Sequence, residues 1–137
     1  MLIEYAGVED REYLAVHDHH VTPQVLQEKI ERQEILVLRQ DAEIIGWLRF
    51  NYFWDSIPFM NMLHIEADFH GQGLGTRLVQ FWEEEMRRRK YKHVMTSSLS
   101  NEQAQHLYRK LGYHDQGALL LPGEPLEIIF YKQLAKS

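Results

Sequence analysis

The stretch HGQGLGTRL, residues 70–78, alternates glycine with other residues and then continues into a helix-forming run. Apolar residues recur from there at helical spacing, at Leu74, Leu78, Phe81, Trp82 and Met86. Glycines at the start of a helix favour anion binding, because the unpaired amides of the first turn point outward and the helix dipole adds positive potential. The stretch therefore predicts an anion-binding loop, although a tight turn with close helix-to-sheet packing would need the same glycines.

The spacing of these glycines excludes two common nucleotide-binding loops. The phosphate loop of NTPases requires GxxxxGK followed by Ser or Thr, and the sequence contains no such string. The dinucleotide fingerprint GxGxxG also fails, because starting at Gly71 puts Thr76 in the last place and starting at Gly73 puts Leu78 there.

The segments around the loop alternate between strand and helix patterns. Strands are predicted over residues 2–6, 34–40, 44–53, 59–67, 92–98, 113–121 and 126–134. Helices are predicted over residues 9–17, 23–32, 74–90 and 101–112, with Thr22 and Asn101 as N-caps and Gly112 just past an end. The strands at 34–40 and 44–53 form an antiparallel hairpin, and 59–67 and 92–98 flank a right-handed parallel crossover. This order predicts a mixed α/β sheet with helices on both faces.

Length and composition indicate a soluble, cytoplasmic protein with a single domain over residues 1–137. No segment has the apolar length of a membrane span, and the acidic N-terminus lacks the pattern of a signal peptide. The absence of cysteine excludes disulfides, thiolate metal sites and transfer through a protein thiol. A net charge of −5 argues against a nucleic-acid partner, and the basic run Arg87–Lys90 is placed as the solvated end of a helix.

Two motifs together resemble one family. HGQGLG, from His70, resembles the pyrophosphate loop of the GCN5-related N-acetyltransferases, in which Gln or Arg usually stands where this chain has His70. NEQAQHLYRKLGY, from Asn101, resembles the same family's later motif of Asn, a spaced Ala, Leu-Tyr, a basic residue and Gly-aromatic. The motifs occur in the family's order, and the resemblance extends over the whole order of strands and helices. It implies a GNAT-like fold with a central mixed sheet of about seven strands.

The resemblance also implies an activity: acetyl-CoA is bound and its acetyl group passes directly to a primary amine of a small molecule or peptide. The main chain of Leu63, His64 and Ile65 would bind the pantetheine arm between splayed strands, with the Ile65 amide polarising the thioester carbonyl. Asn101 would bond the coenzyme arm, and Tyr108 would donate a proton to the leaving thiolate. The loop expected to hold the diphosphate comprises His70, Gly71, Gln72, Gly73, Leu74, Gly75 and Thr76.

The general base is less well defined by the sequence. An alkylamine is mostly protonated at neutral pH and must lose a proton before it attacks. Asn61, His64 and Glu66 are the polar candidates on the central strand, and alternation places His64 and Glu66 on one face and Asn61 on the other. Relatives often have an acid at the position of Asn61, so a water relay to Glu66 or His64 is the hypothesis, with Glu66 as a catalytic residue.

Two other features have functional and structural interpretations. The run HDHH, residues 17–20, suggests a metal site, but adjacent side chains diverge and no matching carboxylate spacing accompanies them, so a polar loop without metal is predicted. Residues 52–55, Tyr-Phe-Trp-Asp, form either an aromatic wall with one acid that suits an organic cation, a core strand end, or a homodimer contact.

Two alternatives to the small-molecule enzyme remain open at this point. One is a non-catalytic acyl-CoA-binding sensor that kept the coenzyme cleft and lost an acceptor, which the missing base supports and the retained Tyr108 opposes. The other is an acetyltransferase of protein N-termini or lysines, which requires an open groove. Likeness of fold does not identify the acceptor amine.

Overall fold

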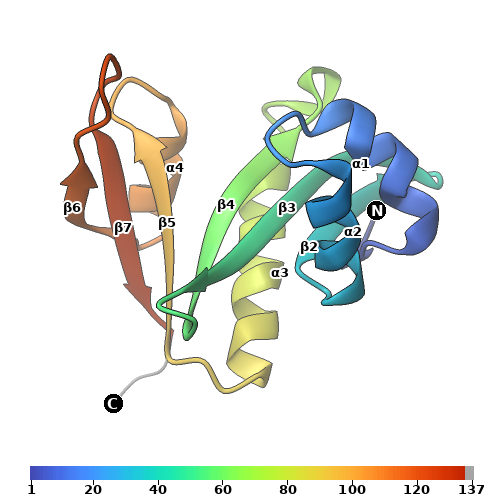
Figure 1. Cartoon of the computed structure of the whole chain (residues 1–137), viewed down its shortest axis with the longest axis horizontal. Helices are drawn as coiled ribbons and strands as arrows, with labels where there is room; N and C mark the ends of the chain where they lie inside the picture. The colour runs from blue at the N-terminus through green and yellow to red at the C-terminus, as the bar shows by residue number, and fades with distance from the viewer. Residues whose placement is uncertain (135–137) are drawn as a thin grey trace. The chain divides into compact units, whose positions relative to one another are not determined.

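The computed structural model describes residues 1–134 (Figure 1). Within these residues, seven strands form a mixed sheet in the order β1-β2-β3-β4-β5-β7-β6. The strands are β1 (Leu2–Tyr5), β2 (Ile35–Gln40), β3 (Glu43–Phe53), β4 (Ile57–Ile65), β5 (His93–Leu99), β6 (His114–Leu119) and β7 (Glu127–Gln133). The α-helices are α1 (Arg11–His17), α2 (Pro23–Glu31), α3 (Leu74–Arg88) and α4 (Ala104–Lys110), with 3-10 turns η1 (Val8–Asp10) and η2 (Ala67–Phe69). The predicted order of strands and helices is confirmed.

Several predicted boundaries shift, and two of these shifts concern the candidate site. β4 ends at Ile65 rather than at residue 67, because Ala67–Phe69 turn into η2, with the Phe69 amide donating to the Glu66 carbonyl at 2.9 Å. The helix predicted from Asn101 begins at Ala104 instead. In contrast, the basic run does end α3 as expected, and Thr22 caps α2 by accepting the Val25 amide at 3.2 Å. Across the described part of the chain, no helix combines the length and apolar character needed to cross a membrane.

The residues divide into two compact units, of which the first comprises Met1–Arg49 and Met62–Leu78. Alternation along β2 sends neighbouring side chains to opposite faces. Val37 packs with the buried residues of α1 and α2, whereas its neighbour Leu38 packs with Leu74 at the start of α3. Helices therefore cover both faces of the sheet in this unit, as predicted.

The second unit comprises Phe50–Asn61 and the residues from Val79 onward. β4 and β5 are parallel, with Phe59 opposite Met95 and Met60 opposite Thr96, as the crossover pattern predicted. β7 lies antiparallel between β5 and β6 (Figure 1). The core of the second unit includes the fully buried side chains of Trp82 and Phe130.

A buried hydrogen-bonded cluster joins α3, α4 and β7 in the second unit. The Tyr113 hydroxyl donates to Glu83 at 2.8 Å, and the Lys132 ammonium lies 3.0 and 3.1 Å from the two oxygens of the same carboxylate. Lys132 also donates to the Leu111 carbonyl at 2.7 Å, just after the end of α4. Gly112 follows with φ of 95°, the left-handed conformation expected past a helix end. The charge of Glu83 is thus fully paired, which makes its burial tolerable.

Candidate active site

The glycine loop presents open main chain directly before α3. Gly71 and Gly73 have φ of 78° and 74°, and an added Cβ at either position would meet nothing within 4 Å. Glycine is therefore required by the backbone conformation and not by close packing, which removes the tight-packing explanation of these two residues. Gly75 lies inside the first turn of α3. The amides that open α3 are the type of donor group that binds phosphate.

His70 connects this loop to the end of β4. Its Nε2 lies 2.6 Å from the Ile65 carbonyl oxygen, which can only accept, so Nε2 carries a proton and donates. The other ring nitrogen, Nδ1, is left for a ligand or for solvent. In its neutral form Nδ1 is an acceptor and faces an anion unfavourably, whereas in the cationic form it donates. The ring thus fixes the loop to the residue whose amide was predicted to polarise the thioester.

β3 approaches the end of β4 closely because of Gly46. An added Cβ at Gly46 would lie 2.7 Å from Ile65 Cδ1 and 2.8 Å from the His64 carbonyl oxygen. The Glu66 amide then donates to the Ile45 carbonyl at 2.8 Å, which fixes the residue that follows the strand. Gly46 therefore sets the position of His64 and Ile65, a role that its isolated occurrence in a strand pattern indicated only weakly.

Glu66 is held by two side chains from different elements. The Tyr13 hydroxyl of α1 donates to Glu66 Oε1 at 2.5 Å, and His64 Nε2 lies 3.7 Å from Oε2. His64 in turn stacks against Trp47, with ring centroids 4.5 Å apart, and Tyr13 stacks on His17 at 4.0 Å. His64 and Glu66 lie together as the alternation predicted.

These contacts keep the Glu66 carboxylate charged. The hydrogen bond from Tyr13 is the main cause that lowers the pKa of Glu66, and it outweighs partial burial; the charges of His64 and His17 act in the same direction. Burial, followed by the bond to Glu66, raises the pKa of Tyr13 far above its usual value. Tyr13 thus remains a donor and Glu66 an anion throughout the neutral range.

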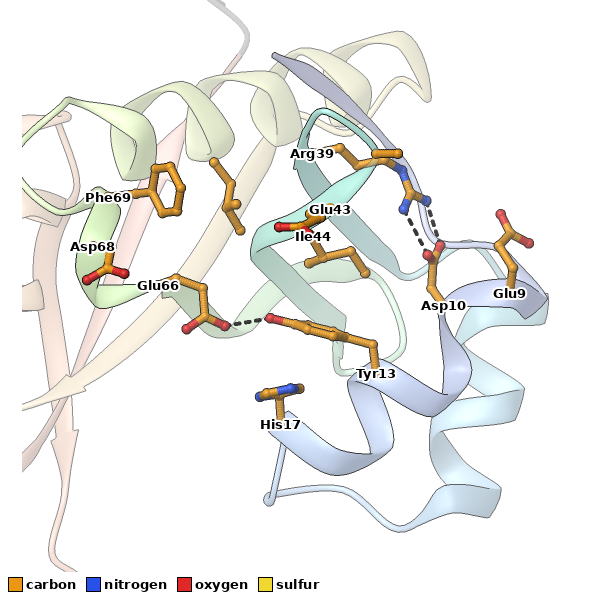
Figure 2. Close-up of a pocket in the computed structure, with 12 residues that line it drawn as sticks. Glu9, Asp10, Tyr13, His17, Arg39, Glu43, Ile44, Glu66, Asp68 and Phe69 are labelled. Atoms are coloured by element: carbon orange, nitrogen blue, oxygen red, sulfur yellow. Dashed lines mark hydrogen bonds and ion pairs between the residues drawn. The ribbon is translucent and has the colours of Figure 1, made fainter.

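Glu66 and Tyr13 belong to the wall of a hollow of about 640 Å³, which we call the acidic pocket (Figure 2). Its acidic lining consists of Glu9, Asp10, Glu43, Glu66 and Asp68. Asp10 is neutralised, because Arg39 donates to its two oxygens at 2.9 and 2.7 Å, as the dashed lines in Figure 2 show. Although burial alone would raise the pKa of Asp10, the bonds from Arg39 and from the Gly7 amide lower it. The remaining carboxylates give this pocket a negative field.

Tyr108 lies on α4 in the second unit and is buried, with 4% of its surface exposed. Its ring packs against Tyr113 and Phe130, with centroids 5.9 and 5.8 Å away. Burial raises the pKa of Tyr108 to about 12; a hydrogen bond with Thr96 opposes that shift, and the charges of Glu102 and Glu127 add to it. The phenol is therefore protonated at neutral pH, as a proton donor must be.

Asn101 does not cap α4, contrary to the prediction. The helix begins at Ala104 with Gln103 as its N-cap, and no side chain bonds that cap. The polar groups of the preceding turn are satisfied by other residues: the Leu99 amide donates to Glu102, and Gln105 donates to the carbonyls of Ser100 and Glu102. Asn101 lies exposed in this turn, and its bond to the coenzyme arm stays a prediction.

The segment His17–His20 contains a buried ion pair. Asp18 is buried and accepts from Arg49 Nε at 2.8 Å, and it also accepts the His20 amide at 3.3 Å. Within residues 1–134, no group of three or more His, Cys, Asp or Glu side chains is arranged to hold a metal ion. Asp18 therefore has a structural partner, which the sequence pattern gave no means of finding.

The arrangement of a glycine loop before a helix, on a mixed sheet of this order, matches known proteins. The model of the acetyltransferase (GNAT) family matches residues 4–113. The chain belongs to this family. The S-alkylcysteine N-acetyltransferase of Bacillus subtilis (strain 168) is 27% identical over 100 residues, which cover 66% of this chain and 56% of the relative. The chain thus spans little more than half the length of that curated relative.

Solved structures share the GNAT fold at low sequence identity. Ard1 from Thermoplasma volcanium has a TM-score of 0.84 and 12% identity, with 98% of each chain covered. The yncA protein of Salmonella typhimurium, solved with its cofactor acetyl-CoA, has a TM-score of 0.78 and 18% identity, with 100% of this chain and 95% of that chain covered. At such identities the likeness establishes the fold and leaves the substrate open.

Proposed function

We propose that this chain is an acetyl-CoA-dependent N-acetyltransferase that moves an acetyl group directly to a primary amine of a small molecule or peptide. The observation that carries the proposal is the open, left-handed main chain of Gly71 and Gly73 ahead of α3 in a member of the GNAT family. We further propose that residues 1–137 act as one N-acetyltransferase domain.

The loop fits the diphosphate of acetyl-CoA chemically. Residues His70–Thr76 supply main-chain amides at a helix start, where the dipole favours negative charge. Gly71 and Gly73 leave these amides uncovered by side chains. In the proposal, the main chain of Leu63, His64 and Ile65 binds the pantetheine amides, and Asn101 bonds the same arm.

The transfer itself needs an amine, a thioester and a proton donor. The amine nitrogen forms a bond to the acetyl carbon, the resulting tetrahedral intermediate breaks its C–S bond, and Tyr108 donates its proton to the departing sulfur. The Ile65 amide stabilises the developing oxyanion. The ammonium loses one proton to solvent in the net reaction, and the amide nitrogen returns one to the phenolate.

The first proton leaves the ammonium through a water relay to the His64–Glu66 pair in this proposal. Glu66 alone is a weak general base, because the hydrogen bond from Tyr13 lowers its pKa. Its carboxylate instead lies 3.7 Å from His64 Nε2, where it helps to orient the imidazole. This division of labour, in which a carboxylate supports a histidine base, is common in enzymes.

The curated relative suggests one acceptor class. A protein named S-alkylcysteine N-acetyltransferase acts on the α-amine of an amino acid, so amino-acid amines belong in the first set of acceptors. Two alternatives, a sensor that has no acceptor and an acetyltransferase of protein N-termini, are distinguished from this function by which amines cause thiol release.

The decisive experiment incubates the protein with acetyl-CoA and a panel of amines and measures free thiol. The chain contains no cysteine, so every thiol detected comes from the coenzyme. We expect thiol release that depends on the amine. Coenzyme binding without release by any small or peptide amine would support the sensor, and release with N-terminal peptides alone would support the protein acetyltransferase.

A matched pair of variants tests the loop. Gly73 and Gly123 both have positive φ, 74° and 75°, and both are open around an added Cβ. Gly73→Val is expected to weaken acetyl-CoA binding at least tenfold, whereas Gly123→Val leaves that affinity unchanged. Equal coenzyme affinity of the two variants by calorimetry would contradict the assignment of the loop.

A further inference from the structure

The second unit contains a hollow of about 580 Å³, within the range of small-molecule sites. We call it the aromatic pocket. It is lined by Phe53, Trp54 and Phe59 of the β3–β4 hairpin, by Leu119 and Leu121 of the β6–β7 hairpin, and by Glu127 of β7, among others. Phe53 packs against Trp54 and Phe59 with centroids 4.6 and 6.2 Å apart. Of the wall predicted from residues 52–55, the three aromatic residues line this pocket, whereas the acid, Asp55, does not.

The hairpin holds Trp54 in a strained and exposed state. Trp54 and Asp55 have φ of 53° and 60°, and the Ser56 amide donates to the Phe53 carbonyl at 3.1 Å, which closes a two-residue turn. A bulky residue rarely adopts this conformation, and Trp54 gains little burial in return, because 79% of its surface is exposed. Strain of this kind is characteristic of ligand-binding segments.

The polar groups of the aromatic pocket are few. Among the described residues that line it, Glu127 carries the single charge. The amide of Asn61 donates to Asn51 at 2.7 Å, so this pair forms a polar patch in the otherwise mainly apolar lining. One carboxylate in an apolar hollow is suited to one ammonium group attached to an apolar body.

The aromatic pocket is coupled to Tyr108 through β5. Ser97 lines the pocket, and the preceding residue, Thr96, is hydrogen-bonded to Tyr108. Consecutive strand residues point to opposite faces, so the pocket and the phenol lie on opposite faces of β5. The Glu127 carboxylate lies near enough to Tyr108 to contribute to its raised pKa, after burial and Glu102.

We propose that the aromatic pocket binds the acceptor, and that the acceptor is a primary amine with an apolar aliphatic or aromatic body whose ammonium group pairs with Glu127. This inference rests on the proposed N-acetyltransferase function. Tyr108 lies on the other face of β5 from the pocket, so the amine and the proton donor act from opposite faces of that strand. Apolar surface around Leu119, Leu121 and Trp54 is covered when the acceptor is bound.

The first test is a series of linear primary alkylamines of increasing length, with spermidine as a hydrophilic polycation for comparison. We expect kcat/KM to rise about three- to fourfold for each added methylene until the pocket is filled. Leu121→Ser should reduce this increase, whereas Leu120→Ser should not, because Leu120 is 84% exposed and does not line the pocket. A preference for spermidine, or a flat response to chain length, would overturn the inference while leaving the transferase function intact.

The second test measures binding and does not depend on turnover. Trp47 and Trp82 are buried, so quenching of tryptophan fluorescence by acrylamide reports mainly on Trp54. Titration with 2-phenylethylamine should protect Trp54 from the quencher, and Glu127→Gln should weaken this binding at least tenfold. Glu124→Gln, on the β6–β7 connection and outside the lining, serves as the matched control and should bind normally.

The two proposals fail in different ways. Protection of Trp54 by the amine without any thiol release would refute the transferase and retain the amine site. Thiol release without protection of Trp54 would refute the amine site. Sedimentation adds a third outcome: a homodimer that Trp54→Ser dissociates and that excludes 2-phenylethylamine would show that a second copy, and not an amine, covers this surface.

Discussion

Tyr108→Phe removes the proposed proton donor with little change in packing. The phenylalanine ring fills the same space against Tyr113 and Phe130, and the loss is confined to one hydroxyl and its bond with Thr96. The raised pKa of about 12 determines the size of the expected effect. A thiol ordinarily has a pKa near 8.5, so full proton transfer from this phenol to a free thiolate is uphill by about 3.5 pKa units.

Tyr108 therefore lowers the barrier chiefly by donating a hydrogen bond to sulfur as its negative charge develops, and its proton passes to sulfur only as the amide nitrogen returns one to the phenol oxygen. A hydrogen bond to a charged group contributes about 1.5–3 kcal/mol, which corresponds to a decrease of about ten- to hundredfold in kcat for the Phe variant. The raised pKa has a second consequence, because wild-type activity should show no alkaline decline from Tyr108 below about pH 10.

The assay follows thiol release at saturating acetyl-CoA and amine from pH 7 to 10. Tyr131→Phe is the matched control, because it removes a hydroxyl that is hydrogen-bonded to His93 in the same unit, away from the site. Calorimetry of coenzyme binding and the melting temperature show whether each variant is folded. A folded Tyr108→Phe protein with kcat within about twofold of wild type would refute the assigned role, since an effect of that size is below that of one charged hydrogen bond.

Three further predictions concern the first unit. Tyr13→Phe removes the donor that lowers the pKa of Glu66, so the carboxyl resonance of Glu66 should titrate at higher pH in a carbon NMR experiment; an unchanged midpoint would contradict the contact. Asp10→Asn should reduce the free energy of unfolding by about 1.5–3 kcal/mol at neutral pH through its weaker bonds to Arg39. The folded-state pKa of Asp10 is lowered, so this stabilisation is present above about pH 4 and is lost as pH falls through the folded value; urea unfolding at pH 7 and pH 3 should show the difference between variant and wild type shrinking. His70→Gln keeps a hydrogen-bond donor but cannot become cationic, so it should bind the coenzyme more weakly than the wild type at the same pH, and equal affinities by calorimetry would exclude a cationic role of His70.

Local signals in the sequence were sufficient for most of the fold. Thr22 followed by Pro23 specified the start of α2, and Gly112 specified the end of α4, because both depend on hydrogen bonds and dihedral angles within one turn. Asn101 carries the same kind of local signal, but the prediction that it caps α4 was wrong. There the side chains of Glu102 and Gln105 satisfy the turn instead, and the helix starts later.

The candidate site was predicted where it depends on one segment and missed where it depends on two. The need for glycine at Gly71 and Gly73 follows from the loop itself. Tyr13 stands 53 residues before Glu66, and no periodicity indicates that its hydroxyl reaches that carboxylate. The same holds for Glu127, whose place in the aromatic pocket follows from strand pairing far along the chain.

The hydrogen-bonded cluster around Glu83 bears on how this protein loses activity on heating. Tyr113 and Lys132 connect the end of the helix that carries Tyr108 to the buried Glu83 of α3. The alignment of the phenol is then lost only when the interior around Glu83 melts. Thermal inactivation and cooperative unfolding should accordingly occur at the same temperature, without an earlier loss of activity from a loosened helix.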